Sequence, residues 1–233
     1  MIVALVAALT LNVTLSPPAH TPALVPITIS LQVTNGSRNP ITLEFPSPDH
    51  YFIQVLDTRH QVLFDSRTKH KPIPEHSKMT FGVGRTRVAS YVWNGLNDEQ
   101  RVLAAPGEYV VHVEVPATST PLSVDVPLKL DAPQTIANVL AASPAPATIQ
   151  GTAERENFLT YLRDDTGRIE LNVPLGLRPQ GTFLVRGTVR TVMNKLSFFT
   201  ERFAPAADNT EPEGTPMPRA TPIPTPSGHP RSR

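Results

Sequence analysis

The 233-residue sequence contains no cysteine, which excludes disulfide bridges, thiolate zinc sites and cysteine nucleophiles. It also lacks an excess of charge of either sign, since 21 lysines and arginines stand against 20 aspartates and glutamates. No global electrostatic field therefore favours nucleic acid or a membrane as a partner. The length is sufficient for one large domain or two small ones.

The motifs of common catalytic sites are missing as well. The chain has no H-E-x-x-H, no G-x-S-x-G, no P-loop and no G-x-G-x-x-G. Asp164 and Asp165 are adjacent in an expected turn, and two solvated carboxylates lack the different environments that acid–base catalysis needs. Four histidines occur between residues 50 and 76, with spacings that match no metal-ligand pattern: His50, His60, His70 and His76. We therefore expect a protein that is not an enzyme and that uses no metal or cofactor.

The first ten residues are apolar and uncharged, which leaves two interpretations. The stretch is too short to cross a bilayer, so no transmembrane span is expected. It fits a signal-peptide remnant without the usual basic n-region, which would indicate an exported, periplasmic or cell-envelope protein. The alternative is a hydrophobic first strand, which is compatible with a cytoplasmic protein.

Residues 11–130 have the pattern of short β-strands. The segment 27–33, ITISLQV, alternates apolar and polar residues and runs into the turn cluster TNGSRNP, after which ITLEF alternates again. About nine such runs, separated by turn residues at intervals of roughly ten residues, predict an antiparallel immunoglobulin-like β-sandwich.

Trp93 is the only tryptophan of the chain, and it ends one of these apolar runs. The next run, EYVVHVEV at 108–115, follows the turn Pro106-Gly107 and places Tyr109 and three valines on one face. A large aromatic side chain at the end of such a strand is predicted to fill the core between the two sheets. A role of Trp93 in binding is the alternative.

The composition changes after residue 130. Residues 131–146 are rich in alanine and proline and are predicted to be an interdomain linker, with a short helical turn at 136–142. Residues 147–203 predict five strands that form a small closed barrel, with Gly187 at a sharp bend and Asn194-Lys195 as a two-residue turn. Residues 204–233 are rich in proline and poor in large apolar residues, so a disordered tail is expected.

Four motifs follow one another in the first domain: ISLQVTNGSRNPITLEF, YFIQVLD, YVWNG and PGEYVVHVEV. In this order and spacing, residues 12–115 resemble the BsuPI-type intracellular proteinase inhibitor family. The resemblance implies an immunoglobulin-like sandwich and inhibition of a subtilisin-like serine protease. It supplies no reactive-site motif that can be carried over residue by residue.

The segment 67–78, RTKHKPIPEHSK, is the most distinctive surface segment of this domain. A loop that enters a protease cleft must lose little conformational entropy on binding, and two prolines restrict the backbone in advance. We therefore expect the protease contact at Lys71, Pro72, Ile73 and Pro74, with Lys71 or Ile73 filling the specificity pocket. The alternative is an ordinary solvated loop between strands.

The motifs LRDDTGRIELNVP and GTFLVRGTVRTVMNKLSFFTERF cover most of the second domain. They resemble bacterial OB-fold domains of the nucleic-acid-binding type, which implies a basic groove with aromatic platforms. The candidate contacts are Arg155, Tyr161, Arg163, Arg168, Lys195 and Arg202. The sequence thus favours a non-enzymatic, inhibitor-like binding protein, with single-stranded nucleic-acid binding or a structural or adhesion role at the envelope as alternatives.

Overall fold

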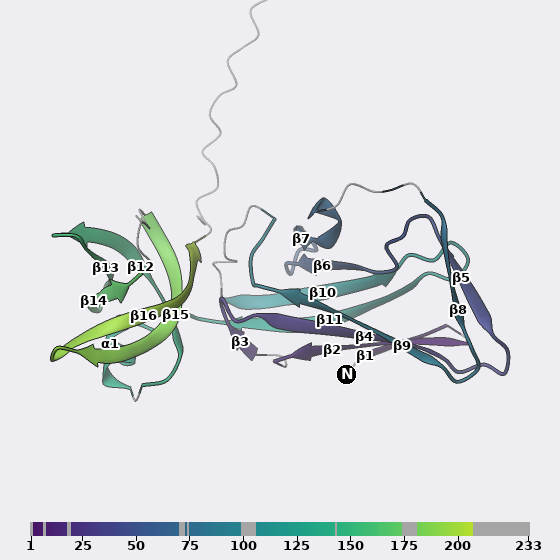
Figure 1. Cartoon of the computed structure of the whole chain (residues 1–233), viewed down its shortest axis with the longest axis horizontal. Coiled ribbons are helices and arrows are strands. Elements are labelled where there is room, and N and C mark those ends of the chain that lie inside the picture. Colours follow the sequence, from purple (N-terminus) through teal and green to yellow (C-terminus); the bar gives the residue numbers. More distant parts are fainter. Residues whose placement is uncertain are drawn as a thin grey trace, which may run out of the picture.

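The computed structural model describes residues 2–6, 8–17, 20–69, 73, 75–98, 106–142, 144–173 and 181–206. Most of these residues are in β-strands, which are divided between a β-sandwich and a closed five-stranded barrel. The two domains lie one after the other along the long axis of the molecule (Figure 1). The predicted all-β fold with a barrel as second domain is therefore confirmed.

The first sheet of the sandwich contains the N-terminal segment. Its four antiparallel strands, in spatial order, are β1 (Ile2–Val6), β2 (Leu9–Ser16), β4 (Ile27–Asn35) and β9 (Thr86–Trp93). Residues 2–6 pair in register with β2, from Ile2 opposite Val13 to Val6 opposite Leu9. In the structure this segment therefore takes the alternative that the sequence left open, a first strand.

The second sheet has five strands, in the order β3 (His20–Pro22), β11 (Leu122–Asp131), β10 (Gly107–Val115), β6 (Phe52–Leu56) and β7 (Val62–Asp65). A separate two-stranded ribbon is formed by β5 (Ile41–Phe45) and β8 (Ser77–Phe81). A short 3₁₀ helix, η1 (Ser66–Lys69), follows β7. The segment that carries the expected protease contact connects η1 to β8.

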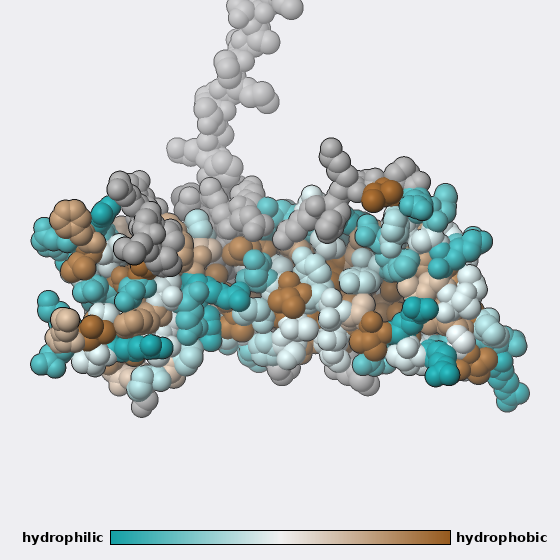
Figure 2. Space-filling model, in the orientation of Figure 1, coloured by the Kyte–Doolittle hydropathy of each residue, from teal (hydrophilic) through white to brown (hydrophobic). Residues whose placement is uncertain are grey.

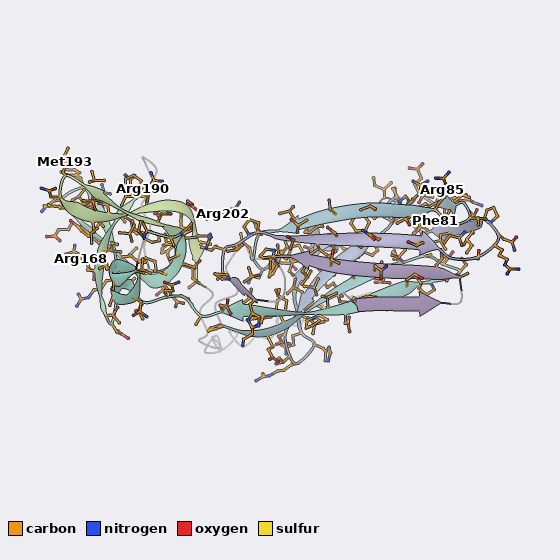
Figure 3. The ribbon with its side chains drawn as sticks, turned by 90° about the horizontal axis from the view of Figure 1, so that it is seen from below. Phe81, Arg85, Arg168, Arg190, Met193 and Arg202 are labelled. Carbon is orange, nitrogen blue, oxygen red and sulfur yellow. The ribbon has the colours of Figure 1, made fainter. Side chains whose placement is uncertain are left out.

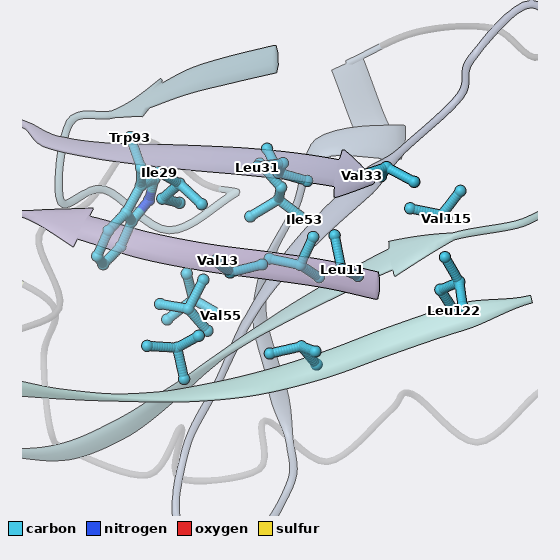
Figure 4. Packing of buried hydrophobic residues seen from close by; sticks show 14 of the residues in the cluster. Leu11, Val13, Ile29, Leu31, Val33, Ile53, Val55, Trp93, Val115 and Leu122 are labelled. Carbon is cyan, nitrogen blue, oxygen red and sulfur yellow. The ribbon is translucent and has the colours of Figure 1, made fainter. Parts of the chain in front are cut away.

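The core of the sandwich lies between the two sheets, where alternate residues of the long strands β2, β4, β10 and β11 are buried. β11 alternates buried and exposed residues along nearly its whole length. The inward residues of both sheets pack into one cluster that includes Trp93, which is only 1% exposed (Figure 4). Its indole Nε1 donates a hydrogen bond of 2.8 Å to the carbonyl oxygen of Leu96, so its polar atom is satisfied. The predicted core position of Trp93 is confirmed.

The barrel has five strands: β12 (Ala147–Glu156), β13 (Leu159–Asp164), β14 (Gly167–Asn172), β15 (Gly181–Val192) and β16 (Lys195–Pro205). They close in the order β12-β13-β14-β16-β15, with a parallel contact between β14 and β16. This is the arrangement of an OB-like Greek-key barrel. The register between β15 and β16 shifts at Gly187, where an added Cβ would lie 2.1 Å from the carbonyl oxygen of Phe199. Only glycine permits this close approach, as the expected bend required.

The barrel begins before residue 147, inside the segment that was predicted to be a linker. The helix α1 (Ile136–Ala141) is capped by the side chain of Thr135 and buries Ile136 and Val139 in the barrel core. The backbone N–H of Gln134 also donates to the carbonyl oxygen of Thr148, at 2.8 Å. The alanine-rich composition suggested a linker, but its two β-branched residues, Ile136 and Val139, are three positions apart and form a helical apolar face.

The turn of the last hairpin lies one residue earlier than predicted. β15 ends at Val192 and β16 begins at Lys195, so the turn residues are Met193 and Asn194 instead of Asn194 and Lys195. Both turn residues have positive φ, as a type I′ turn requires. The register of the hairpin is set by the burial of Phe198 on the inner face of β16. The identity of the turn residues alone does not predict this register.

The two domains are in direct contact through a small apolar cluster. It contains Ala23, Leu24, Leu184, Ala204 and Ala206, with Leu96 packed against it. The two C-terminal alanines of this cluster lie in the segment 204–233 that was expected to be a disordered tail. For residues 204–206 that prediction is wrong, because Ala204 continues β16 and Ala206 donates a backbone hydrogen bond to Thr182. Residues 207–233 lie outside the described part of the chain.

Candidate binding surfaces

The expected protease contact falls only partly on described residues. Lys71, Pro72 and Pro74 lie outside them, whereas Ile73 is described and is 58% exposed. The carbonyl oxygen of Ile73 accepts a hydrogen bond of 2.8 Å from the backbone N–H of Glu75. The structure therefore places one apolar side chain of the candidate loop in solvent.

Asp65 holds the beginning of this segment. Its carboxylate accepts a hydrogen bond of 2.6 Å from Nη2 of Arg67 and one of 2.7 Å from the amide of Gln54. The hydroxyl of Thr68 also donates to the carbonyl oxygen of Asp65. Burial alone would raise the pKa of Asp65, but the hydrogen bonds from Arg67 and Gln54 hold it below its ordinary value. At neutral pH the η1 end of the segment is thus fixed by a charged network.

Ser77 holds the other end. Its hydroxyl donates to the carbonyl oxygen of Ser47 at 2.8 Å and lies 3.0 Å from Nε2 of His50. Burial, together with the charge of Arg87, lowers the pKa of His50, so the imidazole is neutral at pH 7. Because Ser77 already donates its hydroxyl proton to the carbonyl oxygen of Ser47, Nε2 of His50 must be the donor in the hydrogen bond between His50 and Ser77. Both ends of the candidate loop are therefore tied to the sandwich by side-chain hydrogen bonds.

Three of the six candidate nucleic-acid contacts share one outer face of the barrel. Arg168 stacks over the ring of Tyr161, with its Cζ 3.7 Å from the ring centroid. Its guanidinium also donates a 2.6 Å hydrogen bond to Glu156, and Arg163 lies 3.6 Å from Glu154. The pKa of Arg168 is raised, first by the hydrogen bond to Glu156. The arginines of this face are thus already neutralised by glutamates of β12.

The other three candidates lie elsewhere. Arg155 is opposite the buried Thr160 on β13, and so it points to the other side of the sheet from Tyr161. Lys195 begins β16 directly after the turn, and Arg202 lies further along the same strand. The six residues therefore do not form one groove.

Two basic residues that sequence analysis did not single out lie beside Lys195 and Arg202. Arg186 is directly opposite Arg202, and Arg190 lies over the ring of Phe199, with its Cζ 4.9 Å from the centroid. Figure 3 shows Arg190 and Arg202 along the β15–β16 hairpin, with Met193 at its outer end. We call the four residues the basic strip: Arg186, Arg190, Lys195 and Arg202. Among the described residues, none of the four forms an ion pair with a carboxylate.

The alternation of β15 could have revealed half of this strip. Arg186 and Arg190 are four residues apart, so they lie on the same face of a regular strand. Their neighbours on β16 could not be predicted, because the register shift skips Glu201 and depends on the contact at Gly187.

A groove of ≈ 610 Å³ lies between the start of α1 and the barrel. Asp164 lies at its edge, where its carboxylate accepts hydrogen bonds from the N–H groups of Ile136, Thr166 and Gly167. Burial alone would raise the pKa of Asp164, but these bonds and that from the hydroxyl of Thr166 lower it. Asp164 therefore holds the helix and the β13–β14 turn in place.

Two further properties concern metal ions and membranes. In the described ranges, no group of three or more histidine, aspartate or glutamate side chains could hold a metal ion. No helix of that part of the chain is long and apolar enough to cross a bilayer.

No protein-family model matches the sequence, and no curated protein matches it. Among solved structures, the sporulation control protein Spo0M of Bacillus subtilis aligns at 12% identity and a TM-score of 0.41, over 78% of this chain and 80% of that one. A β-glucosidase of Listeria innocua aligns at 10% identity and a TM-score of 0.33, over 53% of this chain. The chain spans only 16% of the length of that enzyme. Similarities at this level support no statement about activity.

Proposed function

We propose that this chain is a non-enzymatic binding protein that inhibits a subtilisin-like serine protease through the segment between η1 and β8. One observation carries the proposal: Ile73 is exposed on a segment whose two ends are tied down at Asp65 and Ser77. Transfer of an exposed apolar side chain from water into a pocket lowers the free energy of binding. Fixed ends reduce the conformational entropy that the segment loses on binding.

The test uses the full chain and several subtilisin-like proteases. Replacing Lys71, Pro72, Ile73 and Pro74 together by glycine and serine should raise the inhibition constant at least about tenfold, or about 1.4 kcal/mol. The matched control is Val88→Ser, which removes a comparably exposed apolar side chain from β9 of the sandwich. Unchanged inhibition by the loop variant would move the contact to another loop. No inhibition by the wild-type chain would refute the proposal.

The basic strip favours a second candidate function, the binding of single-stranded nucleic acid. Cationic side chains that lack acidic partners track phosphates, and Phe199 beneath Arg190 offers a ring near them. Two matched pairs of arginines separate this function from a general charge effect. Arg186→Gln with Arg190→Gln should weaken binding of a single-stranded oligonucleotide and flatten its salt dependence. The control pair Arg163→Gln with Arg168→Gln, whose charges are already neutralised, should do so much less.

If neither a protease nor an oligonucleotide binds, a structural or adhesion role at the cell envelope is the function that we would assign next. The direct contact between the two domains supports such a role.

A further inference from the structure

The outer end of the barrel carries two hairpin turns with unusual exposed side chains. The β12–β13 turn consists of Asn157 and Phe158, and the β15–β16 turn consists of Met193 and Asn194. Phe158 is 92% exposed and Met193 is 95% exposed, the highest values among the large apolar side chains of the described residues. In both turns the side chain therefore stands almost entirely in water.

Apolar exposure is concentrated at these two turns and the residues that flank them. Half of the exposed large apolar side chains in the described part of the chain lie there: Phe158, Leu159, Val192, Met193 and Leu196. We call these five residues the apolar tips. Figure 2 shows hydrophobic side chains at the end of the barrel that faces away from the sandwich. Single exposed apolar residues are common on protein surfaces, but such a concentration marks an interaction site.

The backbone of the two turns gives no reason for these side chains. Phe158 has a φ of 70° and Met193 a φ of 47°, in the left-handed region that bulky residues rarely adopt. A type I′ turn is formed most easily by asparagine and glycine, so phenylalanine and methionine make these turns less stable than they need be. Neither side chain is buried, so neither stabilises the fold, and a contact outside the folded chain is the reason for their presence.

Basic side chains lie directly behind the apolar tips. Lys195 follows the β15–β16 turn, Arg190 precedes Met193 by three residues, and Arg155 precedes Asn157 by two. None of the three cations forms an ion pair within the described ranges. Apolar residues in front and unpaired cations behind are the arrangement that suits an anionic lipid surface.

We propose that the outer end of the barrel binds an anionic phospholipid bilayer, with the apolar tips in the interfacial layer and Arg155, Arg190 and Lys195 at the headgroups. The apolar tips sit on two separate hairpins, and a bilayer accepts each protrusion individually, whereas a protein partner needs a matching pocket for each. Both hairpins extend away from the sandwich, so the described part of the chain leaves their approach to a flat surface open (Figure 1). This proposal does not depend on protease inhibition or on nucleic-acid binding.

The experiment measures sedimentation of the full chain with vesicles of phosphatidylcholine, with and without phosphatidylglycerol. The wild type should sediment with the anionic vesicles and much less with the neutral ones. The double variant Phe158→Ser with Met193→Ser should lower the partition coefficient about tenfold, since insertion of two apolar side chains is lost. Its melting temperature should stay at the wild-type value, because both side chains are exposed. The control Val88→Ser should bind as the wild type does.

A spectroscopic measurement tests insertion without removing an apolar side chain. Phe158→Trp should give an emission that shifts to the blue when anionic vesicles are added, whereas Val88→Trp on the sandwich should not shift. The proposal is overturned if the wild type fails to bind anionic vesicles, or if the double serine variant binds them as tightly as the wild type. The proposal is also overturned if the wild type does not bind vesicles and the double serine variant loses oligonucleotide binding or self-association. The apolar tips would then be assigned to that other partner.

Discussion

The hydroxyl of Thr148 in the barrel donates a buried hydrogen bond of 2.8 Å to the carbonyl oxygen of Ala23 in the sandwich. The apolar cluster between the domains lies beside it, with Leu24 on the sandwich side and Leu184 on the barrel side. A polar contact that is shielded from water holds two surfaces in one relative position better than an apolar contact alone. The two domains therefore meet in a specific interface.

Thr148→Val should weaken this interface, because the carbonyl oxygen of Ala23 stays buried and loses its donor. We expect the free energy of unfolding to fall by about 1–3 kcal/mol, measured by urea denaturation. Thr152→Val on the same strand is the control, since Thr152 is exposed, and its effect should stay within about 0.5 kcal/mol. Equal stability of Thr148→Val and wild type would mean that the hydrogen bond contributes nothing to the interface.

Trp93→Ala should destabilise the sandwich by about 3–5 kcal/mol, because it leaves a large cavity between the sheets. The wild-type fluorescence should be blue-shifted and poorly quenched by iodide, since the indole is 1% exposed. Val92→Ala, one residue earlier and on the exposed face, should cost much less. A wild-type melting curve for Trp93→Ala would contradict its place in the core.

Strand periodicity was sufficient to predict most of the fold. Alternating segments such as 27–33 and 108–115 bury the faces that the pattern indicates, and the barrel has the five strands expected. The role of α1 was harder to predict, because a six-residue helix has only two apolar positions and becomes stable only on the barrel. The burial of Ala204 and Ala206 could not be predicted for a similar reason, because the burial of a small residue can be recognised only when the residues that pack against it are known.

The candidate sites depended more on tertiary structure than the fold did. Tyr161, Arg163 and Arg168 do share a face, as strand alternation allows, but Glu154 and Glu156 approach them only because β12 pairs with β13. The basic strip depends on a register shift that no local pattern encodes. The exposure of Phe158 likewise follows from the turn position and not from its residue type.

Gly187→Ala should disrupt the barrel. The added methyl group would lie 2.1 Å from the carbonyl oxygen of Phe199 and 2.8 Å from the ring of Phe198, so a strand must move. We expect a loss of at least about 3 kcal/mol, at the upper end of overpacking effects. Gly36→Ala is the control, since nothing lies within 4 Å of its added Cβ. Equal melting temperatures for the two variants would show that β16 does not approach β15 so closely.

Asp164→Ala should destabilise the barrel by about 1 kcal/mol, as the loss of a helix-capping side chain does. The effect should depend on pH in a defined direction. The pKa of Asp164 is lower in the folded chain than in the unfolded chain, where it is about 3.9. Its contribution is therefore complete above the unfolded value and is lost as the pH falls through the folded value.

Urea denaturation of wild type and Asp164→Ala from neutral to acid pH measures this contribution. The difference in free energy of unfolding should be constant near neutral pH and should shrink in the acid range below about pH 4. The adjacent exposed residue provides the control, Asp165→Ala. A difference that grows as the pH falls would contradict the assigned hydrogen bonds.

The last prediction concerns two truncations that differ by three residues. Deleting residues 207–233 should leave the melting temperature within about two degrees, because this segment is rich in proline and poor in large apolar residues. Deleting residues 204–233 should lower it by roughly 4 °C or more. This longer deletion removes Ala204 and Ala206 from the cluster between the domains, together with the hydrogen bond from Ala206 to Thr182. It also removes Pro205, which pairs with Phe183 near the start of β15. Differential scanning calorimetry of both truncated chains decides the matter: equal melting temperatures would mean that residues 204–206 are dispensable and that the sequence-based boundary at residue 204 was correct.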